Sequence, residues 1–125
     1  MKNQKISIIL GTRAELIKMF PIMRELKSRK QDYYFIHTGQ HNLQDLCATF
    51  EIKNPDIILS KQPNKSSKFF SNSLKALFWN FYIVFRLRKE LKNLKNLKYV
   101  VYHGDTMTTA SAAIASSRFF NPWKK

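Results

Sequence analysis

The chain has 125 residues, a length that suits one compact domain and leaves no room for two of ordinary size. Hydrophobic residues make up 44% of it, which is enough for a packed core and excludes an intrinsically disordered segment. Its 22 Lys and Arg against 8 Asp and Glu give a formal net charge of +14, but these basic residues are scattered and accompany no recognised nucleic-acid-binding motif. We therefore expect a globular domain whose partners do not include nucleic acid.

The first predicted unit is a buried strand followed directly by a helix. Residues 6–10 form a short, nearly continuous apolar run, which is typical of a strand covered on both faces. Thr12 and Glu15 form a T-x-x-E capping box, so a helix should begin there, and Pro21 should kink that helix or end its first segment. The apolar face of the helix is predicted to consist of Leu16, Ile17, Phe20, Met23 and Leu26.

The same alternation continues to the end of the chain. Further strands are predicted at 33–37, 56–59 and 98–102, and further helices at 42–50, 69–94 and 108–120. Strands that alternate with helices favour a parallel sheet covered by helices on both faces. The prediction is one Rossmann-like α/β domain over residues 1–125, with a polar loop at 60–68 and a terminal stub at 121–125.

Three distinctive stretches follow predicted strands: GTRAELIK at 11–18, HTGQH at 37–41 and HGDT at 103–106. In an open parallel sheet, ligands bind outside the carboxyl ends of the strands. Because the three stretches belong to parallel strands, they should lie at one edge of the sheet. A shared crevice is therefore a better interpretation than three unrelated turns.

The chemistry of the first and third stretches fits an anionic ligand. Gly11 permits a tight turn, the following helix N-terminus favours negative charge, and Arg13 and Lys18 offer cations to a phosphate. The alternative is a plain helix cap with two solvated basic side chains. Asp105 precedes a helix N-terminus, where it is either an ordinary N-cap or a carboxylate held in the crevice for proton transfer.

The remaining reactive side chains give weaker signals. His37 and His41 are four residues apart but span a strand end and a turn, so their spacing disfavours a zinc site. Cys47 is the only cysteine; nothing marks it as an activated nucleophile, and a lone thiol favours a reducing, cytoplasmic setting. The apolar segment 76–85 is too short to span a bilayer, so we expect no membrane insertion and a helix face that meets another surface, such as a partner subunit.

In order and spacing, GTRAELIKMFPIMREL, HTGQH and HGDTMTTASAAIAS resemble the motifs of the non-hydrolysing UDP-N-acetylglucosamine 2-epimerase family. The resemblance extends over about residues 6–120. It implies the N-terminal domain of a glycosyltransferase B-type fold, with the nucleotide sugar bound between two domains. It further implies interconversion of UDP-GlcNAc and UDP-ManNAc by elimination and re-addition of UDP, with no metal or redox cofactor.

The resemblance also assigns roles to individual residues. Gly11, Arg13 and Lys18 would belong to the substrate site, with Arg13 on the UDP. Asp105 would be the catalytic or site-organising carboxylate. Gln40 and His41 would belong to a regulatory UDP-GlcNAc site.

The chain also departs from the family pattern. Ala14 stands in place of a proline, and Leu43 stands where regulatory-site members often have glutamine, which puts allosteric control in doubt. The family pattern continues into a further strand and HVEAGLR, whereas this sequence ends in NPWKK. The C-terminal domain is therefore expected to be absent.

The expected ligand is UDP-GlcNAc or UDP, and activity is expected only if a complementing C-terminal chain supplies the missing groups. A homodimer is a further expected partner. The alternative is a non-catalytic remnant that acts as a binding or subunit-interaction module through the aromatic helix around Trp79.

Overall fold

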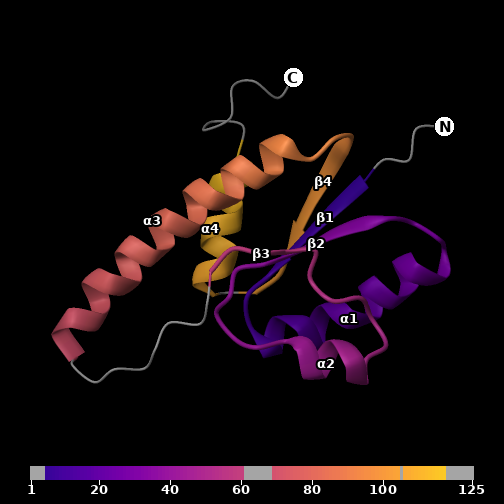
Figure 1. The fold of residues 1–125 in the computed structure, drawn as a ribbon, viewed down its shortest axis with the longest axis horizontal. Helices are drawn as coiled ribbons and strands as arrows, with labels where there is room; N and C mark the ends of the chain where they lie inside the picture. Colours follow the sequence, from indigo (N-terminus) through magenta and orange to yellow (C-terminus); the bar gives the residue numbers. More distant parts are fainter. Residues whose placement is uncertain (1–4, 61–68, 105, 118–125) are drawn as a thin grey trace.

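The computed structural model describes residues 5–60, 69–104 and 106–117, without the side chains of 5 and 69–73. Four strands alternate with four helices along these residues (Figure 1). In chain order they are β1 (Lys5–Leu10), α1 (Arg13–Ser28), β2 (Tyr33–His37), α2 (Gln44–Thr49), β3 (Ile57–Ile58), α3 (Phe69–Asn93), β4 (Leu97–Tyr102) and α4 (Met107–Ser116).

The strands form one parallel sheet in the order β3-β2-β1-β4. Strand β1 lies between β2 and β4, and Ile8 is in register with Phe35 on one side and Val101 on the other. Ile8, Ile9 and Leu10 are completely buried, which confirms the predicted strand covered on both faces. The prediction of a parallel α/β sheet is confirmed.

Helices cover both faces of this sheet (Figure 1). Ile8 belongs to the core cluster shared with α1 and α2, whereas its neighbour Ile9 belongs to the cluster shared with α3 and α4. Successive side chains of a strand point to opposite faces, so β1 contributes to two separate cores. Burial on both faces fixes the position of β1 in the sheet, and therefore the position of the loop that follows it.

Helix α1 begins as predicted but differs from the prediction further along. Both halves of the Thr12–Glu15 capping box are formed. The helix runs through Pro21 to Ser28, so the expectation that Pro21 ends the first segment was wrong. Proline has no N–H to donate to the carbonyl four residues earlier, which belongs to Ile17, and the loss of this one hydrogen bond does not end the helix. Ile17 is 49% exposed. This exposure removes Ile17 from the predicted apolar face, where the buried Met19 takes its place.

Several predicted boundaries shift by a few residues. Helix α2 begins at Gln44 rather than at 42, and the ladder of the strand predicted at 56–59 contains only Ile57 and Ile58. Ser117 is extended, so α4 ends at Ser116 and does not continue to 120. The stub predicted at 121–125 and most of the loop at 60–68 lie outside the described residues.

Candidate functional site

The three motif stretches meet at the carboxyl edge of the sheet, as predicted from the parallel order. Gly11 lies where the HTGQH stretch and the first turn of α4 come close to the end of β1. A Cβ atom on this residue would lie 2.1 Å from Thr108 Oγ1 and 2.4 Å from Thr38 Oγ1. A glycine here lets the two threonine side chains approach the backbone.

Two buried threonines connect the HTGQH stretch to α4. Thr38 Oγ1 and Thr108 Oγ1 are 3.0 Å apart, and Thr108 Oγ1 donates to Gln40 Oε1 at 3.1 Å. A hydroxyl has one proton to donate, so Thr38 donates to Thr108, which donates to Gln40. The side chain of Gln40, predicted to face a regulatory site, is thus hydrogen-bonded to α4.

Glu15 is a buried carboxylate at the centre of the edge, with 2% of its surface exposed. One carboxylate oxygen accepts hydrogen bonds from the backbone N–H groups of Gly11, at 2.7 Å, and Thr12, at 3.0 Å. The other oxygen accepts a hydrogen bond from the hydroxyl of Thr106. The chain's own carboxylate therefore occupies the N–H groups that the sequence suggested for a bound anion, and it also ties α1 to the HGDT stretch.

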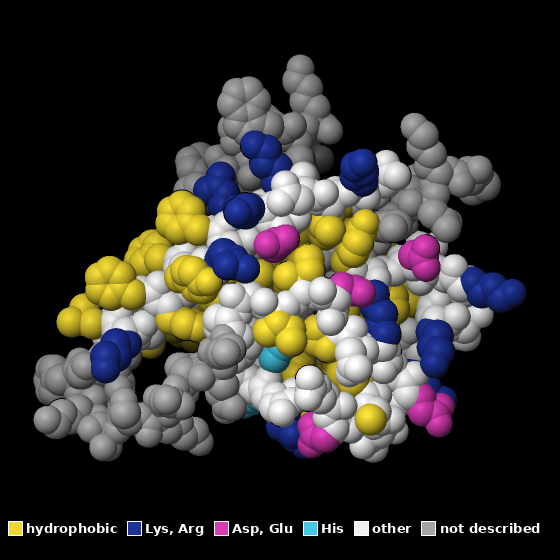
Figure 2. All heavy atoms as spheres, viewed as in Figure 1, with side chains coloured by type: hydrophobic (Ala, Val, Ile, Leu, Met, Phe, Trp, Pro, Cys, Tyr) yellow, Lys and Arg dark blue, Asp and Glu magenta, His cyan; other side chains and the backbone are white. Residues whose placement is uncertain are grey.

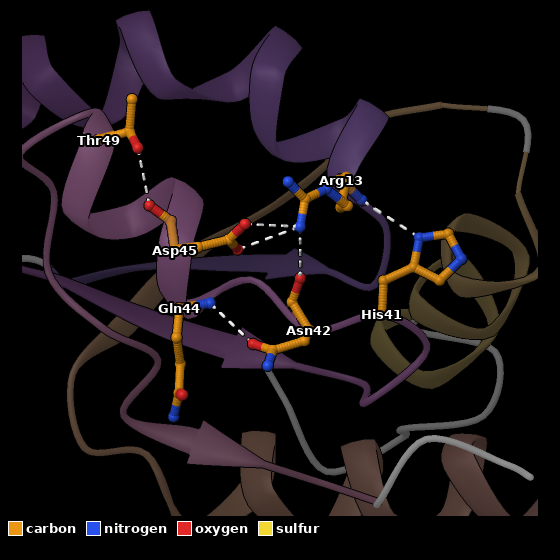
Figure 3. A network of polar contacts seen from close by, with 6 residues as sticks. All are labelled: Arg13, His41, Asn42, Gln44, Asp45 and Thr49. Carbon is orange, nitrogen blue, oxygen red and sulfur yellow. Dashed lines mark hydrogen bonds and ion pairs between the residues drawn. The ribbon is translucent and has the colours of Figure 1, made fainter.

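The Arg13 side chain leaves α1 toward α2 (Figure 3). Its Nη1 atom lies 2.9 Å from Asp45 Oδ2 and 3.1 Å from Asp45 Oδ1, and 3.5 Å from the carbonyl oxygen of Asn42. The backbone N–H of Arg13 donates to His41 Nδ1 at 3.5 Å, and the backbone N–H of His41 donates to the Gly11 carbonyl at 3.0 Å. Two predicted site residues, Arg13 and His41, are therefore neighbours.

The Arg13–Asp45 pair is exposed, with 47% and 61% of the two side chains accessible. The hydrogen bond from Arg13 holds the pKa of the Asp45 carboxyl below its usual value. An exposed pair of this kind is weak, so a ligand carrying more negative charge can replace Asp45 as the partner of Arg13. Lys18 is exposed five residues later, about 140° around the helix, so α1 does not present it on the same side as Arg13.

A cavity of about 270 Å³ opens beside the HTGQH turn. Its lining includes residues of β2, α2 and β3 and of the loops beside them: His37, His41, Gln44, Ile58 and Ser60. His37 is 5% exposed, and its Nε2 atom has no hydrogen-bond partner among the described residues. Its volume is just below the usual range of small-molecule sites, which begins at about 300 Å³.

The buried histidine predicts a dependence of stability on pH. Burial lowers the pKa of His37, and backbone contacts with Gly11 and His41 oppose this more weakly. The unfolded chain therefore binds a proton more readily than the folded chain as the pH falls below about 6.5. We expect the free energy of unfolding, measured by urea titration, to fall between pH 7.5 and 5.5, by at most about 1.4 kcal/mol per pH unit.

Two histidine variants test this assignment. In His37→Leu the decrease in the free energy of unfolding between pH 7.5 and 5.5 should be largely lost, because no imidazole is buried there. The exposed His103 is the matched control, and His103→Asn should keep the decrease. An unchanged pH profile in His37→Leu would contradict the assignment.

The remaining predictions concern Asp105, Cys47, a metal site and a membrane-spanning helix. Asp105 lies outside the described residues, although Gly104 and Thr106 on either side are described. Cys47 is buried, and burial raises the pKa of its thiol, which disfavours a nucleophilic thiolate. Within the described ranges, no group of three or more His, Cys, Asp or Glu side chains is placed to hold a metal ion. Of the helices in those ranges, none is long and apolar enough to cross a membrane.

Fold and edge together define the class: a Rossmann-like α/β domain with its candidate site at the carboxyl ends of parallel strands. No family model matches the chain. The UDP-N-acetylglucosamine 2-epimerase of Methanococcus maripaludis is 35% identical over 118 residues, which is 91% of this chain and 29% of that protein. The Bacillus subtilis protein of the same name is 33% identical over 120 residues, 93% of this chain and 29% of that protein.

Solved structures agree with the sequence relatives. The UDP-GlcNAc 2-epimerase of Neisseria meningitidis, in a crystal structure with bound UDP-GlcNAc, matches with a TM-score of 0.71 and 30% identity, over 94% of this chain and 30% of that one. The chain is therefore similar in sequence and in fold to a portion of the UDP-N-acetylglucosamine 2-epimerases. It spans about 29% of the length of the curated relatives that it matches.

Proposed function

We propose that this chain forms the N-terminal wall of a UDP-GlcNAc 2-epimerase site and binds the UDP part of the nucleotide sugar at the carboxyl edge of its sheet. The observation that carries the proposal is the meeting of GTRAE, HTGQH and HGDT around Gly11 in a chain whose relatives are named for this activity. The diphosphate is the part of the ligand that an arginine at this edge recognises best.

The proposal gives two residues of this wall a role. Arg13 exchanges the exposed Asp45 carboxylate for the diphosphate, because the ligand carries more charge than one carboxylate. Asp105 supplies a carboxylate near the start of α4 for proton transfer at C2 or for organising the site. Epimerisation by elimination and re-addition of UDP needs proton transfer on both faces of C2, and one wall cannot provide opposed groups. Catalysis therefore requires further groups beyond those of these 125 residues, which a complementing chain could supply.

Binding of UDP tests the first part of the proposal. Titration of the 125-residue chain with UDP, followed by calorimetry or by amide chemical shifts, should show binding that perturbs residues around Gly11 and His41. Arg13→Ala should weaken binding about 10- to 100-fold, the size expected for loss of a charged hydrogen bond. Asp45→Asn is the matched control, because it breaks the same ion pair but leaves the arginine in place, and it should bind UDP at least as tightly as the unmodified chain. Equal binding by Arg13→Ala and the unmodified chain would contradict the assignment of the diphosphate to this edge.

Proton exchange at C2 of UDP-GlcNAc in heavy water tests the second part. The isolated chain should catalyse neither exchange nor epimerisation, whereas addition of a chain that supplies the missing domain should restore both, and Asp105→Asn should abolish them again. Turnover by the isolated chain would overturn the requirement for a partner.

The second candidate function, a non-catalytic interaction module, is favoured by one observation, the exposed apolar surface of α3.

A further inference from the structure

One face of α3 carries exposed apolar side chains, which we call the α3 stripe. Each of them has between 45% and 71% of its surface exposed. They are Leu74, Leu77, Phe78, Phe81, Tyr82 and Phe85. Hydrophobic side chains gather over α3 on the face seen in Figure 2, and the beginning of this helix extends beyond the sheet (Figure 1). An apolar patch of this kind marks a surface that contacts something other than water.

The stripe lies on the side of α3 that faces away from the sheet. Ile83, Leu87 and Leu91 are buried and pack in the core shared with α4. At about 100° per residue, the centre of the stripe lies roughly 150° around the helix from that buried face. Helix α3 is therefore held to the domain by its other face, and the core does not need the stripe.

The part of the chain that contains α3 is strongly basic. Residues 57–125 hold 13 of the 22 Lys and Arg but only 2 of the 8 Asp and Glu. Between residues 57 and 89 the sequence has no acidic residue. The stripe therefore belongs to a part of the chain whose charge attracts an anionic surface, over a range of about 10 Å at 0.1 M salt.

Lysines border the stripe. Lys75 directly follows Leu74, and Lys89 and Lys92 each follow a stripe residue by seven positions, about two helical turns, so they continue the face of the stripe. All three lysines are exposed. Glu90, the one acidic residue in the α3 sequence, lies roughly 150° around the helix from the centre of the stripe. The uncovered face of α3 thus combines large apolar side chains with positive charge.

We propose that the α3 stripe binds the surface of a lipid bilayer with anionic headgroups, with α3 lying in the plane of the membrane. Its apolar side chains enter the boundary between headgroups and acyl chains, which amphipathic helices reach to a depth of about 5 to 10 Å. Lys75, Lys89 and Lys92 meet the anionic headgroups, because a lysine keeps its charged end in the polar layer while its stem lies along apolar surface. The opposite face of α3 stays packed in the core, so the helix does not cross the bilayer.

Charge favours this partner over a second copy of the chain. Two stripes in contact would bring together two chains of net charge +14, with the lysines of both copies around one interface. An anionic bilayer is instead bound more tightly because of these charges, by about 5-fold for each lysine near its surface. With about half of each side chain exposed, the six stripe residues offer roughly 600 Å² for the contact.

Sedimentation of the 125-residue chain with large unilamellar vesicles tests the proposal. One set of vesicles consists of phosphatidylcholine, and in the other roughly 30% of it is replaced by phosphatidylserine to give an anionic surface. The chain should bind the anionic vesicles about 10-fold or more tightly than the neutral ones. Raising the salt from about 0.1 to 0.5 M should weaken this binding by screening, whereas it would strengthen the association of two positively charged chains.

The apolar part of the contact is tested by the double variant Phe78→Ser, Phe81→Ser. It should bind the anionic vesicles about 10-fold or more weakly than the unmodified chain, with the same circular dichroism. Ile17→Ser with Ile22→Ser is the matched control, because both isoleucines are 49% exposed on α1, which covers the other face of the sheet. The control should bind as the unmodified chain does.

The charged part is tested by the double variant Lys89→Gln, Lys92→Gln. Its binding to the anionic vesicles should be about 10- to 30-fold weaker. Arg24→Gln with Lys30→Gln removes the same charge from α1 and the turn after it, where the sheet lies between these residues and the bilayer. This control should change the binding by about 2-fold at most, because screening weakens the more distant charges.

A fluorescent label shows which face meets the bilayer. Phe78→Cys and Ile22→Cys each provide one accessible thiol for the label, since Cys47 is buried. Lipids brominated on their acyl chains should quench a label at position 78 and leave a label at position 22 unchanged.

Four results would overturn the proposal. They are no binding to the anionic vesicles, equal binding to both kinds of vesicle, binding that survives the two phenylalanine substitutions, and quenching at position 22 in place of 78. A stable dimer that ignores vesicles would likewise overturn it and assign the stripe to a second copy. The proposal does not depend on the proposed function, since none of these experiments uses a nucleotide.

Discussion

Replacing Gly39 by alanine is expected to lower the free energy of unfolding by about 3 to 5 kcal/mol. Gly39 has a φ of +92°. For a residue with a side chain, this backbone conformation is less stable by about 1 to 2 kcal/mol. A Cβ atom there would also lie 1.9 Å from the carbonyl oxygen of Ser60. Backbone cannot rotate away as a side chain can, so the chain leading out of β3 would have to move. Urea unfolding followed by circular dichroism measures the loss.

Gly104 separates the two causes of this loss. Its φ is +116°, but the nearest atom to an added Cβ is Glu15 Cγ at 3.4 Å, which is ordinary contact. Gly104→Ala should therefore show the cost of backbone strain alone, about 1 to 2 kcal/mol. If Gly39→Ala were no more destabilising than Gly104→Ala, the close approach of Ser60 would not determine the geometry of the HTGQH turn.

The overall architecture could be predicted because it follows from local patterns. Buried strands read as short apolar runs, and the capping box at Thr12 marks the start of α1 within one residue. The assignment of Ile17 to the buried face was an error in the use of helical spacing. At about 100° per residue, Met19 lies on the same face as Leu16 and Met23, and Ile17 does not. Pro21 was expected to kink α1 or to end its first segment, but the helix continues through it to Ser28.

The sequence predicted the location of the candidate site, at one edge of the sheet, but not the contacts between its residues. Parallel order places the three motifs together, and this is confirmed. The contacts within the edge join residues that are far apart in sequence: Thr106 with Glu15, and Thr108 with Gln40. Arg13 likewise meets Asp45, 32 positions away. Such pairs leave no periodic signal in a single sequence, so the capping residue Glu15 was not recognised as the link between α1 and α4.

Removal of the Glu15 carboxylate is the second change for which we expect a large effect. In Glu15→Ala the buried backbone N–H groups of Gly11 and Thr12 and the partly buried hydroxyl of Thr106 lose their acceptor. Unsatisfied buried donors cost about 1 to 3 kcal/mol each, and water entering the space left by the side chain relieves part of this. We expect a loss of about 3 kcal/mol in urea unfolding, together with faster hydrogen exchange at the Gly11 and Thr12 amides.

Glutamine at position 15 distinguishes geometry from charge. Its amide oxygen can accept from Gly11 and Thr12, so both backbone N–H groups keep a partner. Its NH₂ group donates to the Thr106 hydroxyl, which changes from donor to acceptor in this contact, and charge assistance is lost. Glu15→Gln should therefore cost much less than Glu15→Ala. A double-mutant cycle with Thr106→Val isolates the link to α4, and we expect a coupling energy of about 1 to 2 kcal/mol between these positions. Additive effects would mean that Glu15 serves only as a helix cap, and that the HGDT stretch is held at this edge by the sheet and by Thr108 alone.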